Sequence, residues 1–220
     1  MFTGIIAARG TIKALEAKGN DRRLTIAAGA LDMSDVQLGD SIAVDGICLT
    51  VVRFSDNDFV MDASAETLSK STMGEFAVGR AVNLEKALTP TTRLGGHLVS
   101  GHVDGLGVIE SRESVGESLR FRVRVPDALA KYIAVKGSVC IDGVSLTVNN
   151  VDGALFEVNI IPHTAAMTTI NEYKAGRRVN IEVDLLARYL ERLLLGDKAA
   201  QSTTSGVTLE LLAEHGFLKG

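Results

Sequence analysis

The chain has no tryptophan, only three prolines and two cysteines, and aromatic residues make up 5% of its 220 residues. No apolar run approaches the roughly 18 residues that cross a membrane, so we expect no transmembrane helix and no membrane partner. The first residues lack the basic and apolar regions of a secretory signal, which favours a cytoplasmic protein. Cys48 and Cys140 have no metal-type spacing and are expected to be reduced thiols.

A basic excess is missing too, because 23 Lys and Arg residues stand against 27 Asp and Glu residues and give a net charge of -4. Nucleic-acid binding domains usually carry a basic face, and single-strand binders add exposed aromatic side chains. The composition therefore argues against a nucleic-acid partner and against a nucleic-acid-binding barrel of the OB type.

The second half of the chain repeats the first at a constant offset of 97 residues, as from Asp45 to Asp142. Residues 45–51 (DGICLTV) are echoed by 142–148 (DGVSLTV), and 79–85 (GRAVNLE) by 176–182 (GRRVNIE). Solenoid and propeller units are shorter, so this period indicates two copies of one domain. We expect an N-terminal domain over 1–97, a C-terminal domain over 98–184 and a further segment over 185–220.

Short β-branched runs alternate with turn residues in each copy. In the first copy they predict strands over 4–12, 23–28, 41–44, 48–54, 59–63 and 81–85. Asp-Gly dipeptides at 45–46 and 142–143 are strong hairpin signals. Five or six short strands in about 90 residues indicate a small all-β barrel or sandwich, and closure into a barrel removes the exposed sheet edges.

Helical patterns are few. Short helices are expected over 66–73 and 164–170, and Pro90 with Gly95 and Gly96 marks a linker over 89–98. Leucines recur at helical spacing after Asp184 until Gly196, a C-cap candidate. This apolar stripe packs either on the chain's own barrels or on a partner chain. A polar stretch over 199–207 and a short helix over 208–215 are expected to follow.

Five motifs, in this order, resemble riboflavin synthase of the alpha-chain type, the lumazine-binding tandem-barrel family. They are MFTGII at 1–6, GICLTV at 46–51, GGHLVSGHV at 95–103, DGVSLTV at 142–148 and NIEVD at 180–184. The resemblance implies an all-β fold of two tandem six-stranded Greek-key β-barrels followed by a C-terminal α-helix. It also implies a homotrimer held largely by that helix, with sites that join the N-terminal barrel of one chain to the C-terminal barrel of its neighbour. Association with lumazine synthase is an expectation from the same resemblance.

The activity implied by the resemblance is the dismutation of two molecules of 6,7-dimethyl-8-ribityllumazine into riboflavin and 5-amino-6-ribitylaminouracil, without a cofactor or a metal. A four-carbon unit passes from one lumazine to the other, so two similar pockets with unlike polar groups are expected. The copies do differ at several paired positions, namely Ile5 and His102, Cys48 and Ser145, Glu66 and His163, and Ala87 and Asp184. The main alternative is a lumazine- or flavin-binding protein without catalysis.

The catalytic candidates implied by the resemblance are Cys48, His102, Ser145 and Asp184. Cys48 is either a small core residue or a thiol at the lumazine ring. His102 follows Gly101, which permits close approach to a ligand, and its imidazole can relay a proton near neutral pH. Asp184 precedes a helix and suits an N-cap, which is compatible with a catalytic role.

The substrate-binding residues implied by the resemblance fall in matched segments of the two copies. They are Gly4, Ile5, Ile6, Cys48, Leu49, Thr50, Asp62, Ala63, Ser64, Ala65, Glu66, Thr67, Gly101, His102, Val103, Lys136, Ser145, Leu146, Thr147, Asn159, Ile160, Ile161, Pro162, His163 and Thr164. Ribityl is a polyol, so small hydroxyls and backbone amides are its expected partners. His163 stands where Glu66 predicts a second glutamate. A structural role for His97, beside the linker glycines, is as consistent with the sequence as a catalytic one.

Overall fold

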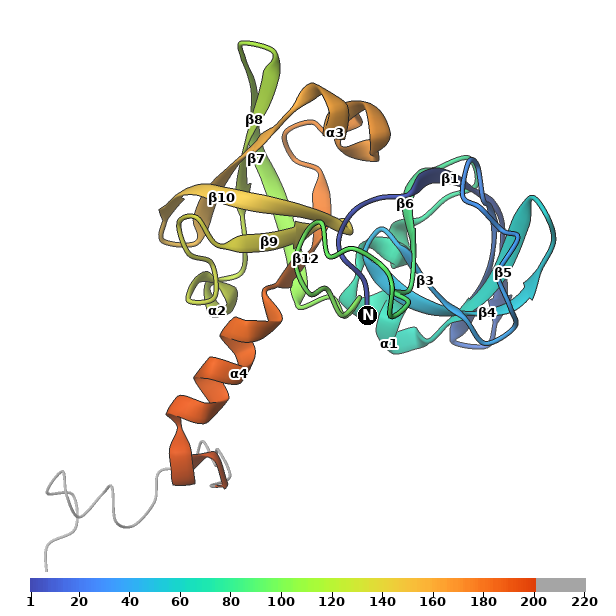
Figure 1. Ribbon diagram of the computed structural model, residues 1–220, viewed down its shortest axis with the longest axis horizontal. Helices are drawn as coiled ribbons and strands as arrows, with labels where there is room; N and C mark the ends of the chain where they lie inside the picture. The colour runs from blue at the N-terminus through green and yellow to red at the C-terminus, as the bar shows by residue number, and fades with distance from the viewer. Residues whose placement is uncertain (201–220) are drawn as a thin grey trace, which may run out of the picture. The chain divides into compact units, whose positions relative to one another are not determined.

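The computed structural model describes residues 1–200 and contains two closed six-stranded β-barrels, one for each copy of the repeat (Figure 1). Both barrels lie in one compact unit, Met1–Ala187, and a second unit begins at Arg188. The fold expected from the sequence is therefore confirmed.

The first barrel is closed in the order β1-β2-β5-β4-β3-β6. Its strands are β1 (Ala8–Lys18), β2 (Asp21–Ala27), β3 (Ser41–Val44), β4 (Ile47–Phe54), β5 (Asp58–Ala63) and β6 (Ala81–Lys86). The connections from β2 to β3 and from β5 to β6 join strands that are not neighbours, as a Greek key requires.

The second barrel repeats this topology with β7 to β12. Its strands are β7 (Gly105–Val115), β8 (Ser118–Arg124), β9 (Ser138–Ile141), β10 (Val144–Asp152), β11 (Leu155–Ile160) and β12 (Arg178–Val183). A short helix that the sequence did not predict, α2 (Asp127–Ala130), lies between β8 and β9.

Alternation of side chains separates each core from the outer face of its barrel. In β4, Ile47, Leu49 and Val51 are buried in the first core, whereas Cys48 and Thr50 face outward. Bulges fall at matching places in the two copies, between Ile12 and Ala14 of β1 and between Ile109 and Ser111 of β7. Such bulges increase local twist and let a short sheet close on itself.

Each connection from the fifth to the sixth strand of a barrel is helical. The first copy has α1 (Ala65–Lys70) and η1 (Thr72–Glu75), and the second has α3 (Pro162–Met167) and η2 (Thr169–Glu172). The helices predicted over 66–73 and 164–170 are thus each divided into an α-helix and a 3₁₀ turn. Ser71 and Thr168 make the division, because each side chain accepts a hydrogen bond from the N–H two residues later.

Residues 89–98 contain no strand or helix, as expected for a linker. After β12 the chain forms α4 (Leu185–Leu194) and η3 (Gly196–Ala200), so Ala199 and Ala200 are helical rather than part of a polar stretch. The rest of that stretch and the helix predicted over 208–215 lie outside the described residues. Within the part of the chain that is described, no helix is long and apolar enough to cross a membrane.

Candidate functional site

The two barrels meet across an approximate two-fold axis that relates residues 97 positions apart. Phe2 and Val99 form an antiparallel bridge on this axis, with N–H to O=C distances of 2.7 and 3.1 Å. The Asp-Gly hairpins lie back to back, and a Cβ on Gly46 would lie 2.6 Å from the backbone nitrogen of Gly143. Only glycine allows this approach. The contact is an isologous interface within one chain.

A buried polar cluster joins the hairpins. Asp45 Oδ1 accepts a hydrogen bond of 2.8 Å from the Asn83 N–H, and Asp142 Oδ1 accepts one of 2.6 Å from the Asn180 N–H. Each asparagine side chain then crosses the interface, because Asn83 Nδ2 donates to the Asp142 carbonyl and Asn180 Nδ2 donates to the Asp45 carbonyl, both at 2.9 Å. The cluster therefore binds one copy to the other.

The two carboxyl groups of this cluster have raised pKa values. Burial, together with the charge of Asp142, raises the pKa of Asp45 to about 7, and Arg80 opposes the rise. Burial also raises the pKa of Asp142, although the Tyr173 hydroxyl donates to it at 2.5 Å. The second copy alone has this donor, because Phe76 takes the place of Tyr173 in the first.

The segments that precede the barrels are exchanged between them. The Gly4 carbonyl accepts a hydrogen bond of 2.8 Å from the Ser145 N–H, and Ile6 packs against the core of the second barrel. In the same way the Gly101 carbonyl accepts a hydrogen bond of 2.8 Å from the Cys48 N–H, and Val103 packs against the first core. Each barrel thus receives a wall from the opposite copy.

This exchange brings Cys48 and His102 to one barrel. We call first pocket the predicted set of Cys48, Thr50 and residues 62–67 together with the wall Gly101, His102 and Val103, and the structure joins Gly101 to Cys48 by the hydrogen bond given above. Cys48 is half-buried and Thr50 exposed, and a Cβ on Gly101 would lie 2.6 Å from Cys48 Cβ. The sequence paired Ile5 with His102 as equivalent positions. It did not show that the segment of each residue lies against the barrel of the other copy.

We call second pocket the matched predicted set of the other copy, which comprises Ser145, Thr147, Lys136, Asp184 and residues 159–164 together with the wall Gly4, Ile5 and Ile6, and the structure joins Gly4 to Ser145 by the hydrogen bond given above. Ser145 and Thr147 face outward from β10, opposite Cys140 and Ser138 of β9. Cys140 is buried beside Phe2 and Ala43, and burial raises the pKa of its thiol. Cys140 is therefore a packing residue.

His97 lies against the second pocket. Its Nδ1 is 2.7 Å from Ser145 Oγ, and its side chain is nearly buried, at 8% exposure. Burial lowers the pKa of His97, and the charge of Asp184 opposes that shift. Nε2 is buried without a hydrogen-bond partner in the described structure. A neutral imidazole with one nitrogen on a serine hydroxyl can exchange a proton with that hydroxyl.

Asp184 directly follows β12 and caps the following helix. Its Oδ1 accepts a hydrogen bond of 3.0 Å from the Leu186 N–H, which confirms the predicted N-cap. The carboxylate is also near enough to His97 to act on its pKa. The capping and site interpretations are thus compatible, and Ala87 supplies no carboxylate at the matching place beside the first pocket.

Four of the predicted substrate-binding side chains point into the barrels and not toward a pocket. They are Leu49, Ala63, Leu146 and Ile160, which belong to the two hydrophobic cores. These positions can offer a ligand only backbone groups. Asp62 is engaged by Arg23 at 2.7 and 2.8 Å, and this ion pair holds its pKa well below the usual range.

The start of each short α-helix carries polar groups toward solvent. Ser64 caps α1 by accepting from the Thr67 N–H at 3.2 Å, and Glu66 in the first turn is exposed. In α3, Pro162 and His163 occupy the first turn without a side-chain cap. The structure therefore keeps the predicted difference between Glu66 and His163 at the same helical position.

Lys136 has φ +67°, in the left-handed region, where Gly39 has φ +92° in the first copy. A side chain there costs about 1 kcal/mol or more relative to glycine. Its N–H donates to the Val148 carbonyl at 2.8 Å, which fixes the turn.

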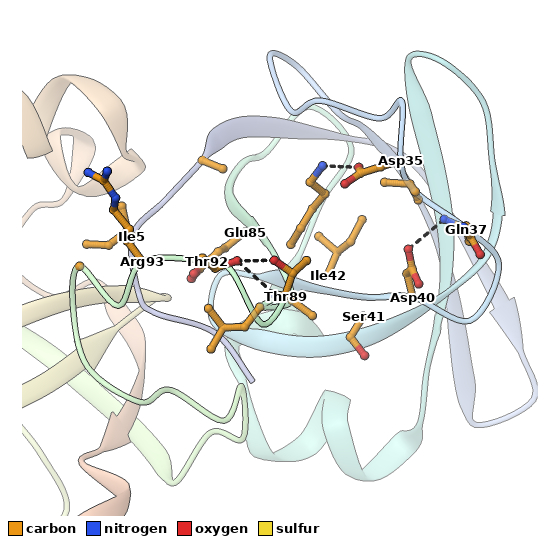
Figure 2. A pocket seen from close by; sticks show the side chains of 16 residues that line it. Ile5, Asp35, Gln37, Asp40, Ser41, Ile42, Glu85, Thr89, Thr92 and Arg93 are labelled. Atoms are coloured by element: carbon orange, nitrogen blue, oxygen red, sulfur yellow. Dashed lines mark hydrogen bonds and ion pairs between the residues drawn. The ribbon is translucent and has the colours of Figure 1, made fainter.

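A cavity of about 780 Å³ is lined in part by Ser41, which is paired with Thr50 across β3 and β4. Figure 2 shows it between the loop that holds Asp35 and Asp40 and the linker that holds Thr89 and Thr92. The other lining residues include Ile5, Ile42, Ala87, Lys86 and Arg93. No group of three or more His, Cys, Asp or Glu side chains within residues 1–200 is placed to hold a metal ion.

Three side chains near the pockets were not among the predicted site residues. His97 was noted only beside the linker, and its contact with Ser145 spans 48 residues. The sequence singled out neither Glu85 nor Glu182, and both are buried, at 7% and 4% exposure. The available signal was that both copies carry a glutamate at the same place in the sixth strand of the barrel.

Comparisons with known proteins agree with this geometry. The lumazine binding domain matches residues 3–87 and 100–184. The riboflavin synthase of Photobacterium phosphoreum is 53% identical over 219 residues, which cover 99% of this chain and all of that protein. The chain belongs to the riboflavin synthase family.

Other relatives in the riboflavin synthase family are similarly complete. The riboflavin synthase of Bacillus subtilis is 40% identical over 218 residues, again 99% of this chain and all of that protein. Among solved structures, the crystal structure of LumP complexed with riboflavin has a TM-score of 0.77 and 25% identity, and the match covers 83% of this chain and 99% of that one. The resemblance found in the sequence motifs is thus confirmed.

Proposed function

We propose that the protein catalyses the riboflavin synthase reaction, in which two molecules of 6,7-dimethyl-8-ribityllumazine yield riboflavin and 5-amino-6-ribitylaminouracil. The observation that carries the proposal is a pair of related but unequal pockets in a chain that matches riboflavin synthases over its full length. The reaction is a transfer of four carbons, and the two products together contain all atoms of the two substrates. No external oxidant or reductant is therefore needed.

The pockets divide the chemistry between different groups. The lumazine C7 methyl is acidic because its anion delocalises into the ring, so one substrate needs only a modest base. The other substrate becomes electrophilic when a nucleophile adds at C7. In the first pocket, Cys48 and His102 supply a thiol and an imidazole. In the second, Ser145 supplies a hydroxyl with His97 at 2.7 Å, and Asp184 supplies a carboxylate.

The remaining predicted residues bind and orient the two rings. Thr50 and Thr147 face outward beside Cys48 and Ser145 and would donate to ring oxygens or nitrogens. The ribityl chains would bind at the N-terminal ends of α1 and α3, beside Ser64 and Ile161. Correct mutual orientation of two bound rings can lower a barrier by several kcal/mol. His97 Nε2, which has no partner in the described structure, is the nitrogen we assign to the bound lumazine.

We further propose a cytoplasmic homotrimer. Within α4 no residue is buried, and Leu190, Leu193 and Leu194 are exposed on a single chain. An amphipathic helix of this kind is stabilised when a partner covers its apolar face. Both cysteines are free, which fits a reducing compartment. Domain limits of 1–97, 98–184 and 185–220 and an association with lumazine synthase stay predictions.

The test of activity is incubation of the purified protein with the lumazine alone. Riboflavin should form, detected by its visible absorbance, with an equal amount of the aminouracil and no added cofactor. Cys48→Ser and His102→Gln should each lower kcat, with Cys140→Ser as the matched control for loss of a thiol. Tight binding of the lumazine without turnover would instead indicate a binding protein.

The assembly is tested by deletion of the chain from Leu185 onward. Light scattering should show the mass of a trimer for the full chain and a lower mass for the shortened one. If the shortened chain is still a trimer, the helix does not hold the assembly together. That result would not bear on the proposed reaction.

A further inference from the structure

Two buried carboxylates hold the exchanged walls in place. Glu85 of β6 accepts from the Thr3 N–H at 2.7 Å, from the Thr3 hydroxyl at 2.6 Å and from the Gly4 N–H at 3.0 Å. These bonds use both carboxylate oxygens. Three charge-assisted hydrogen bonds to one short segment fix its path closely.

Glu182 of β12 does the same for the other wall. It accepts from the Ser100 N–H and hydroxyl at 2.5 and 2.8 Å, from the Gly101 N–H at 2.9 Å and from the His102 N–H at 3.1 Å. Burial raises the pKa of both glutamates, and the hydrogen bonds oppose the rise. The four donors use both oxygens of this carboxylate and tie three consecutive residues of the wall to β12.

Each wall reaches away from the barrel that holds it. Gly4, held by Glu85 of the first barrel, hydrogen-bonds Ser145 of the second. Gly101, held by Glu182 of the second barrel, hydrogen-bonds Cys48 of the first. The glutamate that fixes a pocket wall therefore belongs to the opposite barrel in both cases.

We propose that Glu85 and Glu182 are positioning residues that act crosswise, with Glu182 setting the geometry of the first pocket and Glu85 that of the second. The inference rests on the pockets assigned under the proposed function. Glutamine has the shape of glutamate but replaces one acceptor oxygen by an NH₂ group. In Glu182→Gln that group faces backbone N–H donors, so the wall must move away from Cys48.

Thiol alkylation tests the geometry without any ligand. Cys48 is half-buried under Gly101, whereas Cys140 is fully buried and serves as an internal reference. Glu182→Gln should raise the alkylation rate of Cys48 about tenfold, while Glu85→Gln leaves it near the wild-type rate. In a Cys48→Ser, Ser145→Cys background the two glutamine variants should exchange their effects.

Protection of the thiols from alkylation by bound riboflavin then tests whether the pockets bind ligand. Glu182→Gln should require about ten times more riboflavin to protect Cys48, and Glu85→Gln about ten times more to protect the thiol at 145. A general loss of stability would change both thiols in both variants. Equal effects of the two variants on either thiol, or no effect of either, would overturn the crosswise assignment. If riboflavin protects neither thiol in the parent proteins, the proposed pockets are refuted. The alkylation rates measured without ligand then still decide whether the two glutamates act crosswise.

Discussion

The buried Asp45 carboxyl predicts an unusual dependence of stability on pH. Its side chain is fully buried, and its pKa is raised from 3.8 to about 7. Between about pH 4 and pH 7 the unfolded chain has lost this proton while the native state still holds it. The native state then binds more protons, so stability falls as pH rises through this window. A shift of about 3 units corresponds to at most about 4 kcal/mol.

The change to make is Asp45→Asn. Asparagine tolerates the positive φ of 47° at this position and keeps the hairpin signal, and its side-chain oxygen can still accept from the Asn83 N–H. The asparagine side chain has no proton to lose in this pH range. The variant should therefore lose stability much less steeply than the wild type between pH 5 and pH 8.

The assay is urea unfolding followed by far-ultraviolet circular dichroism at pH 5, 6, 7 and 8, at one protein concentration. The free energy of unfolding of the wild type minus that of the variant should fall by about 2 to 4 kcal/mol across the series. Asp58→Asn is the control, because Lys13 and Ser55 lower the pKa of Asp58 and its effect should be constant in this range. Parallel pH curves for the wild type and Asp45→Asn would refute the reasoning.

Three further outcomes are expected. Gly101→Ala places a Cβ at φ +80° and 2.6 Å from Cys48 Cβ, so urea unfolding should show that the free energy of unfolding falls by about 3 kcal/mol. Gly116→Ala is the control, because Gly116 has φ +59° in open space, and it should lower the free energy of unfolding by about 1 kcal/mol. Equal costs would contradict the close packing. Lys136→Gly should raise stability by about 1 kcal/mol while weakening lumazine binding in a fluorescence titration. Tyr173→Phe removes the hydroxyl donor to the buried carboxylate and should cost about 2 kcal/mol, and an unchanged urea midpoint would count against that bond.

Local patterns were enough to find most strands. The prediction over 41–44 matches β3, and the prediction over 59–63 differs from β5 by one residue. These strands alternate between core and surface and end at turn residues, so their limits are written in the sequence. The first strand was placed over 4–12, but β1 begins at Ala8. Residues 4–7 lie outside β1, because Gly4 bonds to the opposite barrel, which no local pattern records.

The candidate site could be predicted from the sequence only in part, for the same reason. The repeat offset correctly matched Cys48 with Ser145, since both occupy the same place in equivalent strands. It could not show that the segment of His102 lies against the first barrel, because the contact between Gly101 and Cys48 depends on the exchange of walls between copies. The role of Glu182 was hidden as well, since its partners precede it by about 80 residues and only the folded interface brings them together.

The exchanged walls also bear on how the protein is made. The N-terminal barrel can emerge from the ribosome complete in its strands, yet the pocket beside Cys48 has no second wall until Gly101 and the residues after it have been synthesised. The pocket beside Ser145 forms only if Gly4, near the start of the chain, can still bind the second barrel after that barrel has been synthesised. These contacts join residues far apart in sequence, and such contacts form late in folding. Under the proposed assignment of the pockets, ligand binding at either one requires the assembled double barrel, and a ribosome-bound chain that stops before the second copy should bind no ligand.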